Sequence, residues 1–185
     1  MNLPQTALLS LQAPFPIPFL EDGFIWYPCF DENGFLLNDQ LPKVKECIHE
    51  CALKCVEYLK EYVFTKYPPD RVYFFGFGQG GTIALEMSKW IQSAGIISIS
   101  GWPCCKLIPL DTHQPALITY GSFEEKEFKD RMRHCSFASF YKVTDKNESE
   151  MPKTRDEIKR IMEFIGPRLR LRNLELERQC IQINE

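Results

Sequence analysis

The sequence predicts an α/β fold in which helices flank a mostly parallel sheet. Short apolar segments bounded by turn residues, as is typical of buried parallel strands, alternate with longer segments of helical periodicity. Hydrophobic residues make up 44% of the 185 positions, so the chain can bury a sizeable core and is not disordered. No repeat or low-complexity linker interrupts it. We therefore expect one domain over residues 1–167 and a C-terminal extension over 168–185.

Strands and helices alternate along the chain. The predicted strands are Ala7–Gln12, 72–75, 95–100, 116–120 and 139–143. The predicted helices lie near 41–67, 80–93, 124–132 and 152–165. This order favours a parallel sheet covered on both faces.

A long ordered loop is predicted between the first strand and the first helix, because Pro14, Pro16 and Pro18 are incompatible with a helix. The loop carries several aromatic side chains, which we expect to seal an edge of the sheet. Lining a groove near the turn at residues 76–81 is the alternative. These aromatics are Phe15, Phe19, Phe24, Trp26, Tyr27 and Phe30.

The cysteine pattern predicts core packing and free thiols. Cys47, Cys51 and Cys55 are spaced by four residues on one helix, and Val44, Ile48, Leu59 and Tyr62 continue that face. Such a stripe packs against a sheet, whereas a structural zinc ion needs four convergent ligands, which one straight helix seldom supplies. The adjacent Cys104 and Cys105 lack a metal-site spacing. We therefore predict no metal and no cofactor.

Charge and hydropathy exclude other classes of partner. A net charge of -3 gives no reason to expect nucleic acid or an anionic membrane surface. No apolar run approaches the length of a membrane span. Met1-Asn2-Leu3-Pro4 lacks the basic start and apolar stretch of a secretion signal, so the expected location is cytoplasmic.

The most informative segment runs from residue 72 to 85, where an apolar strand leads through a glycine-rich turn into a helix. Gly76-Phe77-Gly78-Gln79-Gly80 has the frame of the nucleophile elbow Gly-x-Ser-x-Gly, in which a sharp turn exposes a serine hydroxyl over the sheet. Gly78 stands at the serine position. Glycine has no side chain, so it cannot attack a carbonyl or be activated by a base.

On these residues the chain resembles the acyl-protein thioesterase and carboxylesterase (phospholipase/carboxylesterase) branch of the α/β-hydrolases, whose elbow commonly reads Gly-Phe-Ser-Gln-Gly-Gly. The likeness covers roughly residues 6–166 and includes Gln12-Ala13-Pro14 and Pro68-Pro69-Asp70-Arg71. It implies a truncated α/β-hydrolase fold, degenerate and short at the N-terminal side. The family's upstream His-Gly segment and one central strand have no counterpart here, which leaves a rearranged pairing, an open strand edge or a partner that fills the gap.

The resemblance also implies three catalytic positions, and each is altered. Gly78 stands at the nucleophile position, and the backbone N–H of Gln79 at the oxyanion position. Glu124 stands at the acid position, although an acidic first turn of a helix explains it as well and is the interpretation we favour. The base loop, 142–153, contains no histidine, while His49, His113 and His134 lie elsewhere. Because a triad is recognised by geometry rather than chain order, His134 stays open.

The sequence therefore predicts a non-catalytic pseudo-esterase that acts as a binding or regulatory module, with a protein partner or by self-association. The alternative is a carboxylesterase or acyl-thioesterase with an unconventional or partner-completed site, for which Cys29, Cys104 and Cys105 are the thiol candidates. Dinucleotide binding through Gly76-x-Gly78-x-x-Gly81 ranks third, because the acidic residue expected about 20 residues further on is missing.

Overall fold

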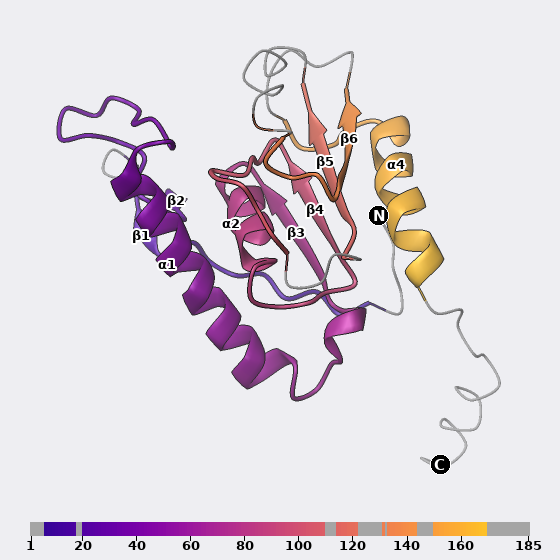
Figure 1. Ribbon diagram of the computed structural model, residues 1–185. Coiled ribbons are helices and arrows are strands. Elements are labelled where there is room, and N and C mark those ends of the chain that lie inside the picture. The colour runs from indigo at the N-terminus through magenta and orange to yellow at the C-terminus, as the bar shows by residue number, and fades with distance from the viewer. Residues whose placement is uncertain are drawn as a thin grey trace.

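The centre of the molecule is a four-stranded parallel sheet with helices on both faces, as predicted. The computed structural model describes residues 6–17, 20–109, 114–121, 131, 133–143 and 150–169. The strands pair in chain order, β3-β4-β5-β6 (Figure 1). They are β3 (Tyr73–Phe77), β4 (Gly95–Ile99), β5 (Ala116–Tyr120) and β6 (Ala138–Lys142). Each lies within two residues of its predicted bounds.

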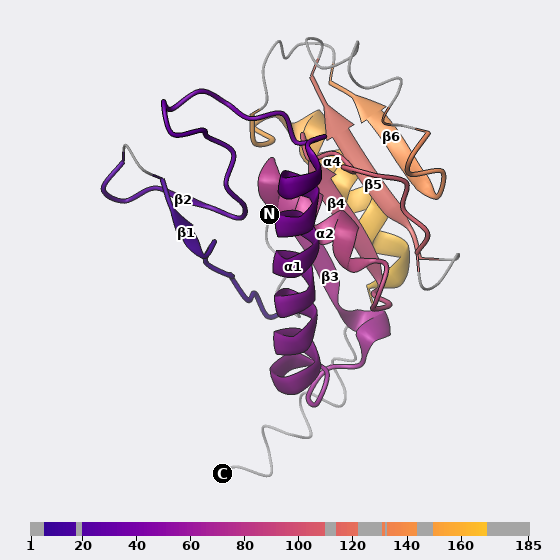
Figure 2. The ribbon, with the colours of Figure 1, turned by 60° about the vertical axis from the view of Figure 1, so that its left-hand side comes forward.

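Three helices of the described residues cover the sheet. Helices α1 (Pro42–Tyr58) and α2 (Gln79–Met87) lie on one face and α4 (Arg155–Ile165) on the other, which gives three layers (Figure 2). Successive side chains of β4 pack against opposite helical layers, because side chains alternate between the two faces along a strand. Ile96 joins the α1/α2 core cluster, and Ile97 joins the cluster formed with Ile161 of α4. No helix of the described residues is long and apolar enough to cross a membrane.

The first helix ends in a π-helical turn, η1 (Leu59–Val63), that changes which face of the chain is buried. Val44, Ile48 and Cys51 are buried, as predicted. The prediction is wrong for Tyr62, whose side chain is 53% exposed and lies against Tyr58 with ring centroids 5.0 Å apart. A π turn holds more residues than an α turn, so the four-residue spacing no longer returns to the core. Val63 and Phe64 pack there instead.

The predicted strand Ala7–Gln12 is wrong. Residues 6–13 form no strand, and Leu8 and Leu9 are exposed. The alternating apolar pattern is present, but the segment pairs with no described strand, β3 included, and without a ladder of hydrogen bonds a strand does not persist. The chain instead forms a short antiparallel pair in the predicted loop, β1 (Phe15–Pro16) with β2 (Phe24–Ile25).

Strand β3 is the outer strand of the sheet, with no partner on its free side among the described residues. On this strand Phe75 and Phe77 are 44% and 42% exposed, while Phe74 and Gly76 are buried. Because side chains alternate, Phe75 and Phe77 share the face that α4 covers further along the sheet. That face is therefore left open at β3.

The remaining short elements are η2 (Pro69–Arg71), before β3, and η4 (Gly166–Arg168), after α4. A capping box begins α4: Thr154 accepts from the backbone of Glu157, and the Glu157 carboxylate accepts from the Thr154 backbone at 2.8 Å. The seven cysteines in the described ranges are all free thiols. The predicted helix 124–132 falls almost entirely outside those ranges, as does the chain beyond residue 169.

Candidate active site

The turn between β3 and α2 has the geometry of a nucleophile elbow. Gly78 has φ 51° and ψ -120°, a conformation that side chains rarely adopt. Its N–H donates to the Ile99 carbonyl at 2.8 Å, and its own carbonyl accepts from Thr82 N–H at 3.1 Å. A Cβ placed on Gly78 would meet no heavy atom within 4 Å. The position that carries a serine in the elbow motif is therefore open space.

The strand and the helix approach too closely at this turn for any residue but glycine at position 76. A Cβ at Gly76 would lie 2.3 Å from the carbonyl carbon of Gly80. The contact is with backbone, which cannot move aside as a flexible side chain can. The chain thus keeps the tight turn of the motif while it lacks the nucleophile.

Gln79, the residue after the turn, uses its side chain to hold the preceding loop. Its Oε1 accepts from the Trp26 N–H at 2.8 Å, and its Nε2 donates to the Tyr27 carbonyl at 3.2 Å. Its own backbone N–H, at the predicted oxyanion position, belongs to the first turn of α2, where amides have no acceptor within the helix. The sequence gives no sign of this role, because a glutamine side chain can form hydrogen bonds with the backbone of any loop that lies near it.

Tyr27 is a buried residue of this loop, and burial raises its pKa to about 12. Its hydroxyl interacts with Thr82 of α2, whose Oγ1 also accepts from the Trp102 N–H at 3.2 Å. The aromatic loop therefore packs on helix α2 at Tyr27, and no contact of the described residues places it on an edge of the sheet, where we expected it. Phe15 and Phe24, in contrast, are 39% and 47% exposed.

Of the predicted acid and base candidates, the structure describes only His49 and His134. Glu124 and His113 fall outside the described residues. His49 lies on α1 with its Nδ1 3.5 Å from a carboxylate oxygen of Glu86. The His134 carbonyl accepts from Leu107 N–H at 2.8 Å, and its Nδ1 is buried without a hydrogen-bond partner among the described residues. Neither interaction involves Gly78 or Gln79.

Ser100 is a hydroxyl that the sequence analysis did not single out. It follows β4, next to the elbow, and is the only described residue other than glycine with a positive φ, 51°. Its N–H donates to the Thr119 carbonyl at 2.8 Å. Strained backbone of this kind gathers at functional sites. No sequence signal marks such a conformation, because it results from packing against neighbouring strands.

A pocket lies beside Ser100 at the carboxyl ends of β4, β5 and β6, where open α/β sheets usually bind ligands. Glu157 lines it but is already occupied with the capping box of α4. The other lining residues are Ile99, Ser100, Thr119, Tyr120, Gly121, Tyr141, Val143, Glu150, Pro152 and Ile161.

The three thiol candidates differ in environment. Burial raises the pKa of Cys29, and a hydrogen bond with Gln79 partly opposes that rise. Burial, together with the charge of Glu86, raises the pKa of Cys104 to about 12. Both groups are protonated near neutral pH, and a thiol is a poor nucleophile compared with a thiolate. Cys105 lies with its sulfur 3.2 Å from the Lys89 amino group.

A protein family and a curated relative match part of the chain. A family model described as phospholipase/carboxylesterase matches residues 1–119. A curated relative, an uncharacterized hydrolase of Mycosarcoma maydis, is 39% identical over an alignment of 109 positions that covers 54% of this chain. The match spans only 39% of that relative's length.

Solved structures show the same fold. Arabidopsis thaliana SOBER1 superposes with a TM-score of 0.59 at 16% identity, covering 88% of this chain and 83% of that one. A Bacillus cereus carboxylesterase gives 0.58 at 14% identity, covering 82% and 73%. Zea mays acyl-protein thioesterase 2 gives 0.53 at 13% identity, covering 78% and 72%. At these identities the likeness concerns the fold alone.

Proposed function

The chain belongs to the phospholipase/carboxylesterase family, and we propose that it is a non-catalytic member, a pseudo-esterase that acts as a binding or regulatory module. The module is the hydrolase-like domain over residues 1–167, and residues 168–185 form an extension to it. Its ligand is an acyl ester or thioester, held at the elbow without being cleaved.

Gly78 carries this proposal. The turn holds its backbone at φ 51° and ψ -120° with open space above the α-carbon, so the site is built but has no attacking atom. Among the described residues no histidine contacts the turn, so a hydroxyl brought there by another group would lack a base. Ester hydrolysis by this family's chemistry needs both.

A fluorophosphonate probe tests the proposal, because it reacts covalently with activated serines. The full chain is incubated with the probe and with p-nitrophenyl butyrate, and the Bacillus cereus carboxylesterase serves as the positive control. We expect neither labelling nor saturable turnover. Saturable hydrolysis that follows the 185-residue chain through a second purification would overturn the proposal.

A second candidate function, a hydrolase with an unconventional site, is favoured by one observation. Ser100 combines a hydroxyl with a strained backbone beside the elbow and the pocket. If this serine is the nucleophile, the probe labels the peptide that contains it, and Ser100→Ala abolishes labelling while Ser136→Ala, at an exposed position, leaves it unchanged.

A further inference from the structure

A cluster of metal-binding side chains lies away from the elbow, between the end of α2 and the loop after β4. Glu86 contributes a carboxylate that is 3% exposed, and Cys104 and Cys105 contribute two sulfurs from adjacent positions. One ligand atom from each of the three lies within 4.8 Å of the others. Carboxylate and thiolate groups at such separations can bind one ion, since zinc accepts ligands at about 2.0–2.3 Å.

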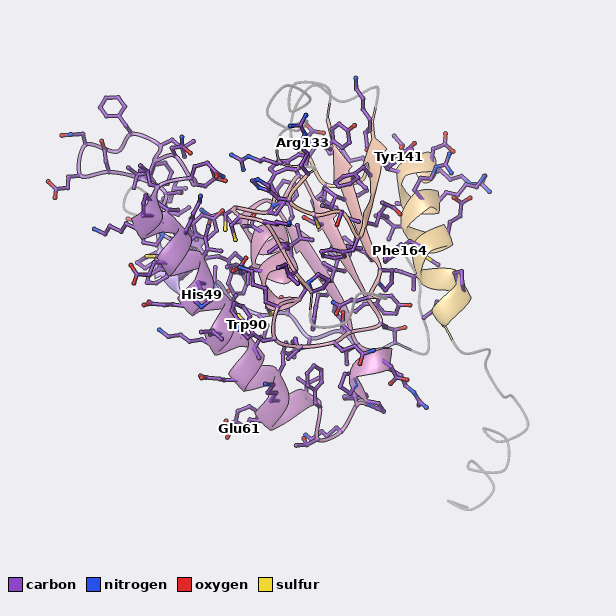
Figure 3. The ribbon with its side chains drawn as sticks, viewed as in Figure 1. His49, Glu61, Trp90, Arg133, Tyr141 and Phe164 are labelled. Carbon is purple, nitrogen blue, oxygen red and sulfur yellow. The ribbon has the colours of Figure 1, made fainter. Side chains whose placement is uncertain are left out.

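His49 extends the cluster from a third element. Its Nδ1 lies 3.5 Å from Glu86 Oε1, and its ring packs edge-on against Trp90 with centroids 4.7 Å apart. Figure 3 shows His49 on α1 beside Trp90, which follows α2. The His49 side chain is 49% exposed, so a small rotation can bring the nitrogen to an ion held by Glu86.

Lys89 balances the negative charge of the buried Glu86 carboxylate in this structure. Its amino group contacts Glu86 Oε1 and lies 3.2 Å from the Cys105 sulfur, so a cationic group already sits where the ligand atoms converge. An unpaired carboxylate at this depth would be costly. The Lys89 side chain is 22% exposed and can turn towards solvent.

From this juxtaposition we propose that Glu86, Cys104, Cys105 and His49 form a binding site for a zinc-like divalent cation. On binding, both S–H bonds break, two sulfur–metal bonds form, and the two protons pass to solvent. The carboxylate and two thiolates then carry three negative charges, which the divalent cation and Lys89 together neutralise. Charge balance therefore holds in the metal-bound state as it does in the Glu86–Lys89 pair. No oxidation or reduction is involved.

The site joins three segments that are distant in the sequence. A cation there would tie α1, α2 and the 104–105 loop together on one face of the sheet, and this geometry implies a structural rather than a catalytic ion, since four protein ligands leave no open position. The sequence predicts no metal here, because adjacent cysteines lack a metal-site spacing and nothing in the sequence places Glu86 or His49 beside them.

Cobalt binding tests the proposal, since Co²⁺ replaces zinc and reports its ligands spectroscopically. The full chain, reduced and freed of metal with a chelator, is titrated with Co²⁺. We expect one ion per chain, with thiolate charge-transfer absorption in the near ultraviolet and tetrahedral bands in the visible, both removed by one equivalent of Zn²⁺. Absence of these bands in excess Co²⁺ would overturn the proposal.

Variants then locate the ion. Cys105→Ser should show about half of the charge-transfer absorption and bind Co²⁺ at least tenfold more weakly. Cys29→Ser, the matched half-buried control, should bind Co²⁺ as the original chain does. His49→Ala should keep the thiolate absorption and lose affinity about tenfold or more. Circular dichroism confirms that each variant is folded. A Co²⁺ spectrum unchanged in folded Cys105→Ser, or a Co²⁺ affinity unchanged in folded His49→Ala, would overturn the proposed set of ligands.

Discussion

Gly78 holds a backbone conformation that serine adopts only when the surrounding turn imposes it. Here the turn is imposed from both sides, by the hydrogen bond to Ile99 and by the close approach of Gly76 to Gly80. The geometry is therefore independent of the residue at position 78. A serine would be held in the strained conformation rather than relaxing out of it.

Gly78→Ser should fold and gain no esterase activity. The new side chain enters open space, and the positive φ costs about 1–3 kcal/mol of unfolding free energy. One member of a triad returned without its base gains little, because triad residues act as a unit. Urea denaturation measures the stability, and stopped-flow hydrolysis of p-nitrophenyl butyrate measures the activity. A burst of acyl-enzyme would reveal a hidden base, for which His134 is the first candidate.

Gln79→Leu should destabilise the protein by about 1–3 kcal/mol, since two loop backbone groups lose their hydrogen-bond partner. Gln12→Leu, at an exposed position, is the matched control and should change stability by less than about 0.5 kcal/mol. Chemical denaturation compares the two. Equal effects would mean that the Gln79 clamp contributes nothing to stability.

Among the elements, α4 depends on how it begins. Its inner face supplies Ile161 and Ile165 to the smaller core cluster, and the capping box fixes where the helix starts relative to the sheet. Glu157 is buried, and its carboxylate accepts from the Thr154 backbone. The same residue therefore caps the helix and lines the pocket. Loss of the cap would therefore disturb both.

Thr154→Ala should lower the unfolding free energy by about 1 kcal/mol, the usual cost of an N-cap hydroxyl. Thr65→Ala provides the control, because Thr65 is exposed beyond the end of η1 and caps no helix. Thermal and urea unfolding report the difference. If both variants lose the same stability, the capping interaction is not the cause.

Elements whose signal is local were predictable. The four sheet strands follow from short apolar runs between turn residues, and α2 follows from the glycine turn that precedes it. Ala7–Gln12 carries the same kind of signal, but a strand also needs a neighbour, which the pattern does not contain. The prediction for Tyr62 was wrong because the spacing of apolar residues does not reveal a π turn. In the same way, the motif predicted that Gly78 stands at the nucleophile position. The roles of Gln79, Ser100 and the Glu86 cluster were not predictable, because they depend on contacts between distant segments.

At the scale of the whole molecule, the three layers are incomplete at β3. No strand of the described residues pairs with the outer edge of β3, and Phe75 and Phe77 expose an apolar surface beside that edge. Open edges with apolar neighbours favour pairing with another chain. Both features lie on one strand, so a single contact would cover them together.

The purified chain should therefore self-associate or bind another polypeptide. Light scattering over a dilution series should give a mass that rises with concentration, and Phe75→Ser should reduce that rise. Phe35→Ser removes an exposed aromatic from a loop instead and should leave the association unchanged. A monomer whose mass is insensitive to concentration, with a cooperative melt, would show that the remaining strands suffice alone.

The order β3-β4-β5-β6 has a consequence for how the molecule is made. Each strand meets its neighbour after one connecting segment, so every pairing in the sheet closes a loop of modest length, and the entropy cost of closing such a loop grows only slowly with its length. Synthesis releases the strands in the same sequence in which they pair. On the ribosome, β3 can receive β4 before β5 and β6 have been translated, and no strand has to wait for a later one to be inserted between them.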